Sequence, residues 1–314
     1  MKIAAGIMKT VMRGLSALPL GFHYACSGLM AWFLRDVMHY RRDVVTVNIA
    51  RSFPDRKYRE LKRISRGFYR HLGEILAETV WFGGCRNPER LRKKRLVEYS
   101  NIGVLEDAFA HSPGVVVLES HSGNWELTGG CLCYDYRPVE ERKEMIGTED
   151  VVVVYKPLRS KTWDEVMRVN RCAPVLRYGY EGYISSGEIL RYALEHRDSK
   201  KVYVFPTDQC PYKGAFSDDT VTFMHQPTKT MLGGASLAHK FGYSVLFLSM
   251  MPESRGHYKC SFVPICDDAG SMTPHEIMQR YYDLLQADLE KCPENYLWSH
   301  KRWKNLGIYD ENKQ

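Results

Sequence analysis

Short runs of apolar, β-branched residues recur along most of this 314-residue chain, and stretches of helical periodicity separate them. Such runs are typical of strands buried on both faces, and their alternation with helices predicts an α/β fold with a mainly parallel, twisted sheet flanked by helices. The predicted strands are Val115–Leu118, Val151–Tyr155, Val202–Phe205, Ser244–Ser249 and Tyr258–Pro264. The predicted helices are Ile102–Ala110, Asn124–Cys133, Lys161–Arg171, Ser185–His196, Met231–Phe241 and Thr273–Lys291, and Thr207–Thr230 is predicted as a long loop.

The N-terminal part of the chain has a different pattern. Gly14–Leu34 contains no Asp, Glu, Lys or Arg, and as one helix it would be about 31 Å long, close to the hydrocarbon thickness of a bilayer. This predicts a membrane anchor that spans the bilayer or lies in its interface, with a buried helix or a cleaved signal peptide as alternatives. We expect residues 1–95 to form this anchor and a basic helical region, a membrane-facing extension, and residues 96–314 to form the α/β core; one continuous domain is the alternative.

Charge and cysteine content restrict the partners and the compartment. Lys and Arg number 44 against 37 Asp and Glu, a net charge of +7 that favours an anionic lipid surface, an acidic carrier protein or a phosphorylated substrate over nucleic acid. The run Arg90–Arg95 is either a solvated helix face or a contact for anionic head groups. Nine Cys residues in a chain of this length indicate reduced thiols and a cytosolic body.

The segment from Leu118 to Leu127, with the sequence LESHSGNWEL, carries the clearest chemical signal. His121 follows the end of a predicted strand, where open α/β sheets bind their ligands. Gly123 permits a positive φ or a close backbone approach, and Asn124 is predicted to cap the next helix. Glu126, in the first helical turn, is predicted to turn back toward His121. An imidazole paired with a carboxylate is suited to act as a general base toward a hydroxyl, and the free N–H groups at the helix start are suited to an oxyanion.

The sequence His121-Ser-Gly-Asn-Trp-Glu126 resembles the H-x4-D/E motif of glycerolipid acyltransferases. More narrowly, it is similar to the HxGNWE form of the bacterial lipid A late acyltransferase family. Further blocks resemble that family in the same order along the chain, and Ser122, Lys156, His225 and Gln226 depart from its usual residues. These blocks are Val154–Leu158 with Arg171, Phe205–Gln209, Phe223–Thr230 and Cys292–Lys304.

The resemblance implies a glycerolipid-acyltransferase-like fold and a role for each matching residue. His121 would be the general base and Glu126 its partner. Lys156 and Arg171 would hold an acceptor phosphate or the developing oxyanion, and Asp208 would hold the same cation. Gly123 and Asn124 would line the substrate site. For the two cations an ordinary surface position is the alternative, and for Asp208 a turn aspartate before Pro211.

The function that the resemblance implies is an O-acyltransferase of lipopolysaccharide biosynthesis. It would move a fatty acyl chain from an acyl-carrier-protein thioester to a hydroxyl of a lipid A precursor, a Kdo-modified disaccharide, at the cytoplasmic face of a bacterial inner membrane. A related enzyme acting on a phosphatidylinositol mannoside, an aminoacyl lipid or a lysophospholipid is one alternative, and a non-catalytic membrane-binding module is another. We find no Gly-x-Ser-x-Gly elbow and no Gly-rich phosphate loop, so we predict direct transfer, no cofactor and no metal.

Overall fold

The computed structural model describes residues 2–83, 85, 87–143, 146–158, 160–171, 182–211 and 220–309, and all structural statements below refer to them. In these residues a seven-stranded sheet has the order β1-β9-β8-β2-β5-β3-β4. The five strands from β8 to β4 run parallel, β9 is antiparallel to β8, and β1 is parallel to β9. The strands are β1 (Val97–Tyr99), β2 (Val115–Glu119), β3 (Val151–Tyr155), β4 (Tyr183–Ser185), β5 (Val202–Pro206), β8 (Ser244–Ser254) and β9 (His257–Cys266).

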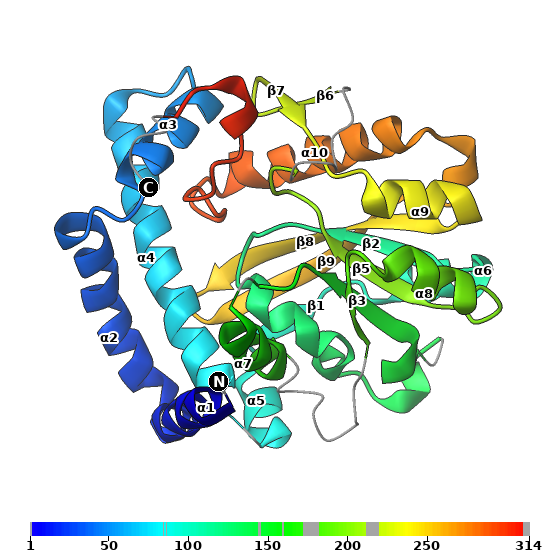
Figure 1. Ribbon diagram of the computed structural model, residues 1–314, viewed down its shortest axis with the longest axis horizontal. Helices are drawn as coiled ribbons and strands as arrows, with labels where there is room; N and C mark the ends of the chain where they lie inside the picture. Colours follow the sequence, from blue (N-terminus) through cyan, green and yellow to red (C-terminus); the bar gives the residue numbers. More distant parts are fainter. Residues whose placement is uncertain are drawn as a thin grey trace.

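Helices cover both faces of this sheet and one end of it. Figure 1 shows α9 and α10 together over one face, and α4 running past the end of the sheet with α2 beside it. The α-helices are α1 (Lys2–Ala17), α2 (Leu20–Trp32), α3 (Arg42–Ser52), α4 (Tyr58–Gly83), α5 (Pro88–Lys94), α6 (Gly103–His111), α7 (Lys161–Arg171), α8 (Ile189–Glu195), α9 (Gly233–Phe241) and α10 (Pro274–Lys291). A π-helical turn η1 (Phe33–Val37) and the short 3₁₀ helices η2 (Trp125–Tyr134), η3 (Val139–Glu141), η4 (Thr148–Asp150), η6 (Ala269–Ser271) and η7 (Lys304–Leu306) complete the described elements.

Alternation along the central strands builds two apolar layers. In β2, Val116 and Leu118 pack into the layer under α9 and α10, whereas Val115 and Val117 pack into the opposite layer. Each buried aliphatic side chain of this kind contributes about 1.5–3 kcal/mol by its removal from water. The predicted mainly parallel α/β sheet flanked by helices is thus confirmed.

The N-terminal region shares the first of these layers. Val45 and Ile49 of α3 and Phe68 of α4 are buried in the same cluster as Leu118 of the sheet. The predicted boundary at residue 95 therefore divides two regions that share one hydrophobic core, and it stays a prediction.

The apolar stretch Gly14–Leu34, whose length as a single helix suggested a membrane span, belongs to two helices. The chain breaks at Pro19, which lacks an N–H and has an extended ψ of 144°, so α1 and α2 are separate helices. Among the described residues no single helix is long and apolar enough to cross a membrane, although the pair Gly6–Ala17 and Leu20–Val37, bent by 111°, passes the test of length and composition together.

Several local predictions need correction. The loop predicted over Thr207–Thr230 contains, in its described part, an antiparallel hairpin of β6 (Thr220–Phe223) and β7 (Gln226–Lys229). The helix predicted at Asn124–Cys133 is the tighter 3₁₀ helix η2. Strands β1 and β4 were not predicted, since each is only three residues long and lies at an edge of the sheet.

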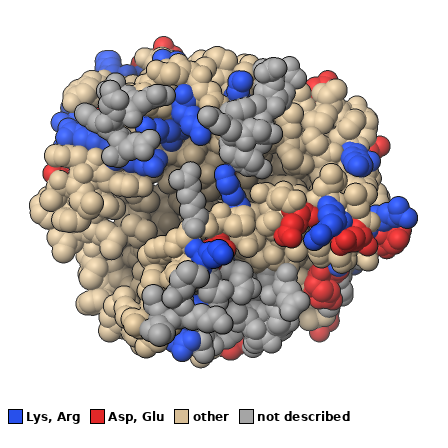
Figure 2. All heavy atoms as spheres, in the orientation of Figure 1, with Lys and Arg blue, Asp and Glu red and all other residues tan. Residues whose placement is uncertain are grey.

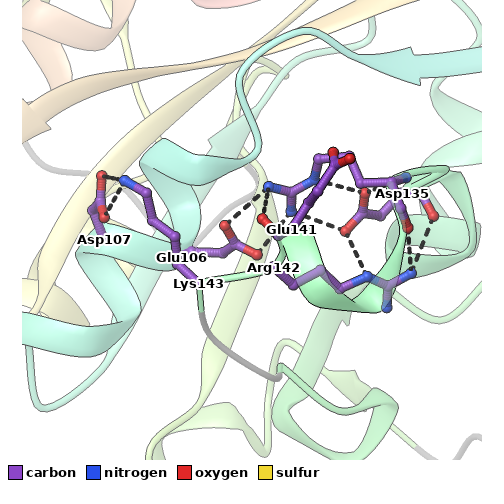
Figure 3. Close-up of polar contacts among 7 residues, drawn as sticks. Glu106, Asp107, Asp135, Glu141, Arg142 and Lys143 are labelled. Atoms are coloured by element: carbon purple, nitrogen blue, oxygen red, sulfur yellow. Dashed lines mark hydrogen bonds and ion pairs between the residues drawn. The ribbon is translucent and has the colours of Figure 1, made fainter.

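Ion pairs attach the chain after η2 to helix α6 (Figure 3). Arg137 donates to Glu106 at 2.8 Å and to Asp135 at 2.9 Å, and Lys143 contacts the exposed Asp107 at 2.9 Å. Glu106 and Asp135 are buried, so Arg137 compensates two carboxylates that would otherwise lie unpaired in the interior. These contacts fix the polypeptide that leaves the His121 segment.

Candidate active site

The register between β2 and β5 places His121 opposite Asp208. Glu119 pairs with Pro206 across these neighbouring parallel strands, and each of the two side chains comes two residues after its pair member. The imidazole Nδ1 lies 2.6 Å from the Asp208 carboxylate, and the backbone amide of His121 also donates to that carboxylate. A strand-to-strand contact between residues 87 positions apart therefore provides the carboxylate partner of His121.

The electrostatics of this pair favour charge separation. Burial lowers the pKa of His121, but the carboxylates of Asp208, Glu119 and Glu126 together, Asp208 foremost, outweigh this effect, and the pKa lies above the ordinary value for histidine. Burial raises the pKa of Asp208, and the neighbouring His121 more than reverses it, so that the carboxyl is ionised. The pair is thus suited to accept a proton onto the imidazole and to stabilise the imidazolium that results.

The tautomer of His121 follows from its two neighbours. Because Asp208 accepts, Nδ1 carries the hydrogen and donates, which leaves the lone pair on Nε2. The amide Nε2 of Gln209 donates to that lone pair at 2.9 Å. A substrate hydroxyl that takes the place of the Gln209 amide would meet a base with the correct orientation.

Glu126 has a different partner from the one that the sequence predicted. Its carboxylate forms a two-pronged ion pair with Arg171, with Nε at 2.7 Å and Nη2 at 3.0 Å, and it also accepts from the Trp125 indole at 3.1 Å. Direct pairing with His121 is replaced by the Asp208 contact, because η2 carries Glu126 toward the end of α7. Glu126 still raises the pKa of His121 through space, so both carboxylates act on the same imidazole.

Gly123 and Asn124 follow His121 in the chain and are held by contacts with the protein interior. Gly123 has a φ of +59°, and an added Cβ would lie 2.6 Å from Met250, so the predicted special conformation and close approach are confirmed. Its N–H donates to Asn295 at 2.8 Å. Asn124 is fully buried, its Nδ2 donates to Glu78, and its Oδ1 accepts no bond, so the predicted N-cap is wrong. The predicted contacts of both residues with substrate stay predictions.

Comparison with known proteins decides the family. Residues 3–145 and 190–305 match the profile of the family described as bacterial lipid A biosynthesis acyltransferase. The chain belongs to this family. It is also 22% identical, over 286 residues, to a lipid A biosynthesis acyltransferase of Shigella flexneri, an alignment that covers 87% of this chain and 82% of that protein. The predicted family is confirmed, the protein is an acyltransferase, and its family implies a lipid acceptor.

In this acyltransferase the remaining predicted cation lies at the same edge of the sheet. Lys156 is exposed and follows directly after β3, the neighbour of β5, so the carboxyl ends of three adjacent strands carry His121, Asp208 and Lys156. Figure 2 shows a hollow in this face, at the end of the sheet near α4, and Lys and Arg side chains gather above it where Figure 1 shows α3. The predicted role of Lys156 in holding a phosphate or an oxyanion stays a prediction.

The C-terminal block Cys292–Lys304 of the acyltransferase contacts the segment that carries Asp208 and Gln209. His300 Nε2 accepts the N–H of Cys210, next to Gln209, and burial lowers the pKa of His300 to about 4, so this ring is a neutral acceptor. Trp298, Arg302 and Trp303 are buried. These side chains therefore form a packed cap on the protein core and do not present an aromatic and basic surface to a membrane interface.

Two site residues were missed by sequence reasoning. Gln209 had a signal, because it adjoins Asp208 in the Phe205–Gln209 block that resembles the family. Glu119 had none, because a carboxyl at the end of a strand is ordinary in sequence. Burial raises the pKa of Glu119 to about 7, with partial offset by His121 and Thr128, which places a third titratable carboxyl beside the pair.

Proposed function

We propose that this acyltransferase moves a fatty acyl chain from an acyl-carrier-protein thioester to a hydroxyl of a Kdo-modified lipid A precursor, with His121 as general base. The observation that carries this proposal is the His121–Asp208 pair, in which the imidazole Nε2, as far as the described residues go, accepts a hydrogen bond from the Gln209 amide alone. An acceptor hydroxyl is the kind of group that such a lone pair deprotonates.

The reaction balances without a covalent enzyme intermediate. The acceptor hydroxyl gives its proton to His121 Nε2 while its oxygen attacks the thioester carbonyl carbon. A carbon–oxygen bond forms, the carbon–sulfur bond breaks, and the thiolate of the carrier leaves with the proton from His121. Asp208 stabilises the imidazolium between these two events, because it holds Nδ1 at 2.6 Å.

Glu126 and Arg171 are proposed to supply the cation for the oxyanion or for an acceptor phosphate. Burial lowers the pKa of Arg171, but the Glu126 carboxylate outweighs this effect and the guanidinium remains charged. Only Nε and Nη2 bind Glu126 among the described residues, so the Nη1 donors of the guanidinium are proposed to bind a ligand. Glu126 acts in this scheme by orienting Arg171 and by raising the pKa of His121.

A concentrated basic surface supports an anionic partner. Residues 41–70, which include α3 and the first half of α4, contain ten Lys or Arg against three Asp or Glu, an excess of seven that equals the net charge of the whole chain. In the described residues none of these ten cations forms an ion pair with a carboxylate. Asn48 of α3 donates to the carbonyls of Trp298 and His300, so this basic surface is packed against the block that supports His121. An acidic carrier protein or an anionic glycolipid would be attracted to it.

The apolar faces of α1 and α2 support contact with a membrane, and the cytoplasmic side of the inner membrane is proposed because the proposed donor is a soluble carrier protein. Large apolar side chains on these helices and on η1 remain exposed, among them Val11, Phe22, Leu29, Trp32 and Phe33. Large exposed apolar side chains on helices of this kind are typical of a membrane contact. The membrane-facing extension thus remains part of this proposal.

The test is an assay with separated donors and acceptors. Full-length protein is incubated with isotope-labelled acyl carrier protein or with acyl coenzyme A, and with a lipid A precursor, a lysophospholipid or an aminoacyl lipid, and the products are identified by mass spectrometry. We expect an acylated lipid A precursor from the carrier-protein donor, and loss of at least 100-fold in rate in His121→Ala. If only a lysophospholipid or an aminoacyl lipid is acylated, the proposed acceptor is wrong. If His121→Ala transfers the acyl chain at the wild-type rate, His121 is not the base.

A further inference from the structure

Glu78 is a buried carboxylate that the proposed reaction does not use. It lies on α4 with no exposed surface, and within the part of the chain that the structure describes its hydrogen-bond partners include no cation. Three groups donate to it: Tyr24 of α2 at 2.8 Å, Asn124 at 2.7 Å and Tyr258 of β9 at 3.0 Å. An ionised carboxylate that is buried without a cation is expensive, so its three donors have to hold it in place.

Only a carboxylate suits this set of donors. Oε1 accepts from Tyr24, and Oε2 accepts from both Asn124 and Tyr258. A glutamine at the same place would present one acceptor oxygen and two further donors, leaving at least one donor unsatisfied. Burial raises the pKa of Glu78 above its ordinary value, and the three bonds from Asn124, Tyr24 and Tyr258 offset this rise only in part.

The contact with Asn124 makes Glu78 part of the support of His121. We define the histidine loop as residues 120–126. On one side Asn295 joins the N–H of Gly123 to the carbonyl of Met250, at 2.8 Å and 2.9 Å. On the other side Glu78 binds Asn124. The loop is therefore held between the C-terminal block and helix α4.

The contact with Tyr24 extends this support to helix α2. An added Cβ at Gly73 would lie 2.6 Å from the carbonyl oxygen of Ser27, so α2 and α4 pack backbone to backbone one turn away from Glu78. Arg255 donates to the carbonyl of Tyr24 at 2.9 Å and to Ser27 Oγ at 2.8 Å. One face of α2 is fixed to the body in this way, and its other face exposes Phe22, Leu29 and Trp32.

We propose that Glu78 is a positioning residue that joins helix α2 to the histidine loop, through Tyr24 on one side and Asn124 on the other. Displacement of α2 then loosens the histidine loop and lowers turnover. The displacement reaches the loop through two hydrogen bonds, from Tyr24 to Glu78 and from Asn124 to Glu78. This inference rests on the proposed function only in taking His121 as the base. The link from α2 to the loop is independent of the substrate.

The first test is hydrogen exchange of the full-length protein without substrate. Tyr24→Phe and Tyr258→Phe each remove one hydroxyl from Glu78, but only Tyr24 belongs to α2, so the second variant is the matched control. We expect Tyr24→Phe to speed exchange in both α2 and the histidine loop by about 3- to 10-fold, the loss expected for one hydrogen bond. Tyr258→Phe should leave exchange in α2 unchanged. Equal effects of the two variants, or an unchanged loop in Tyr24→Phe, would overturn the proposal.

The second test displaces α2 by packing. Gly73→Ala forces the Ser27 carbonyl to move, whereas in the control Gly67→Ala the new Cβ meets only the Glu294 side chain. We expect Gly73→Ala to speed exchange in the loop, and the combination with Tyr24→Phe to add little, because the connection is already cut. Additive effects, or a loop that exchanges at the wild-type rate in Gly73→Ala, would contradict the coupling.

Kinetics separate positioning from mere stability. In the acyl-transfer assay Tyr24→Phe is expected to lower kcat about 3- to 10-fold with KM unchanged, because the substrate contacts remain and only the loop geometry changes. Thermal unfolding of both tyrosine variants should show similar losses. A fall in kcat that is equal in the two variants would indicate a structural role for Glu78. If no acceptor is acylated at all, the proposed function fails while the exchange result stands.

Discussion

Asp208→Asn is the substitution that most sharply distinguishes Asp208 from Glu126 as the partner of His121. The variant keeps the size of the side chain but replaces the anion that holds Nδ1 at 2.6 Å. An amide NH₂ turned toward Nδ1 would force the hydrogen onto Nε2, which would leave no lone pair for the acceptor hydroxyl. The variant should therefore bind its substrates and fail in the proton transfer.

The expected size follows from what a general base contributes. Loss of a positioned base costs about 10²–10⁴ in rate, which corresponds to about 2.7–5.5 kcal/mol of the activation barrier. We expect kcat of Asp208→Asn to fall within this range, and KM to change little. The double variant with His121→Ala should be hardly slower than His121→Ala alone, since the two residues act as one unit.

The pH profile gives the second half of this prediction. His121 acts in its neutral form, so kcat/KM falls as the pH falls through the pKa of His121. In the wild type this acidic limb should lie above the ordinary histidine value, because the pKa is raised. In Asp208→Asn the limb should move to lower pH, since burial, which lowers the pKa, then meets less opposition.

The assay is steady-state acyl transfer from acyl carrier protein between pH 5.5 and 9, with Glu126→Gln as the matched control. Glu126 is the weaker of the two influences on His121, so its variant should shift the limb less than Asp208→Asn. Wild-type kcat in Asp208→Asn, or a larger shift in Glu126→Gln, would refute the pairing of His121 with Asp208.

Three further outcomes are expected. Arg171→Ala and Glu126→Ala should each lower kcat, and steady-state kinetics of the double variant should show no more loss than the worse single variant, since the ion pair acts as one unit. Glu106→Gln should lower the free energy of unfolding by about 1.5–3 kcal/mol in urea titration while kcat stays constant, because it weakens a buried charged bond to Arg137, which pairs with Glu106 and Asp135 and not with His121 or Asp208. Deletion of residues 1–34 should release part of the protein from vesicles in a flotation assay, and high salt should then strip the truncated form but not the full-length protein, since salt screens charges and leaves apolar insertion intact.

The sheet could be predicted from the chain because its central strands are short apolar runs. Val115–Leu118 and Val151–Tyr155 form strands in the structure nearly as predicted. A strand that is buried on both faces is a continuous apolar run, and such a run can be identified from the local sequence alone. The three-residue strands β1 and β4 carry too short a pattern for this. The predicted helix Lys161–Arg171 has the same bounds in the structure, because its apolar residues recur on one side at helical spacing.

The contacts of the site could be predicted only in part, because they depend on the order of the strands. The sequence pointed to His121 and also to Asp208, but it assigned the wrong pairing, since the short distance along the chain favoured Glu126. The contact with Asp208 requires β2 and β5 to be neighbours, which no local pattern reveals. For the same reason Glu78, which is 46 residues from Asn124, gave no signal.

The bend at Pro19 shows a different limit. An uncharged stretch of 21 residues has the length of a membrane span, but a single imino acid divides it into two helices. The composition of the segment indicates that it favours an apolar environment, but the break at Pro19 determines that it forms two helices and not one.

The most direct test of the central claim is to measure the mass of the lipid acceptor after reaction with a carrier protein whose acyl chain is labelled with deuterium. The full-length wild type is compared with His121→Ala. We predict that in the wild type one labelled acyl group replaces the hydrogen of a hydroxyl of the lipid A precursor, with release of the carrier thiol, and that His121→Ala forms this product at least about 100-fold more slowly. An acceptor of unchanged mass in the wild type, or the same labelled product at equal rates in both proteins, would contradict it.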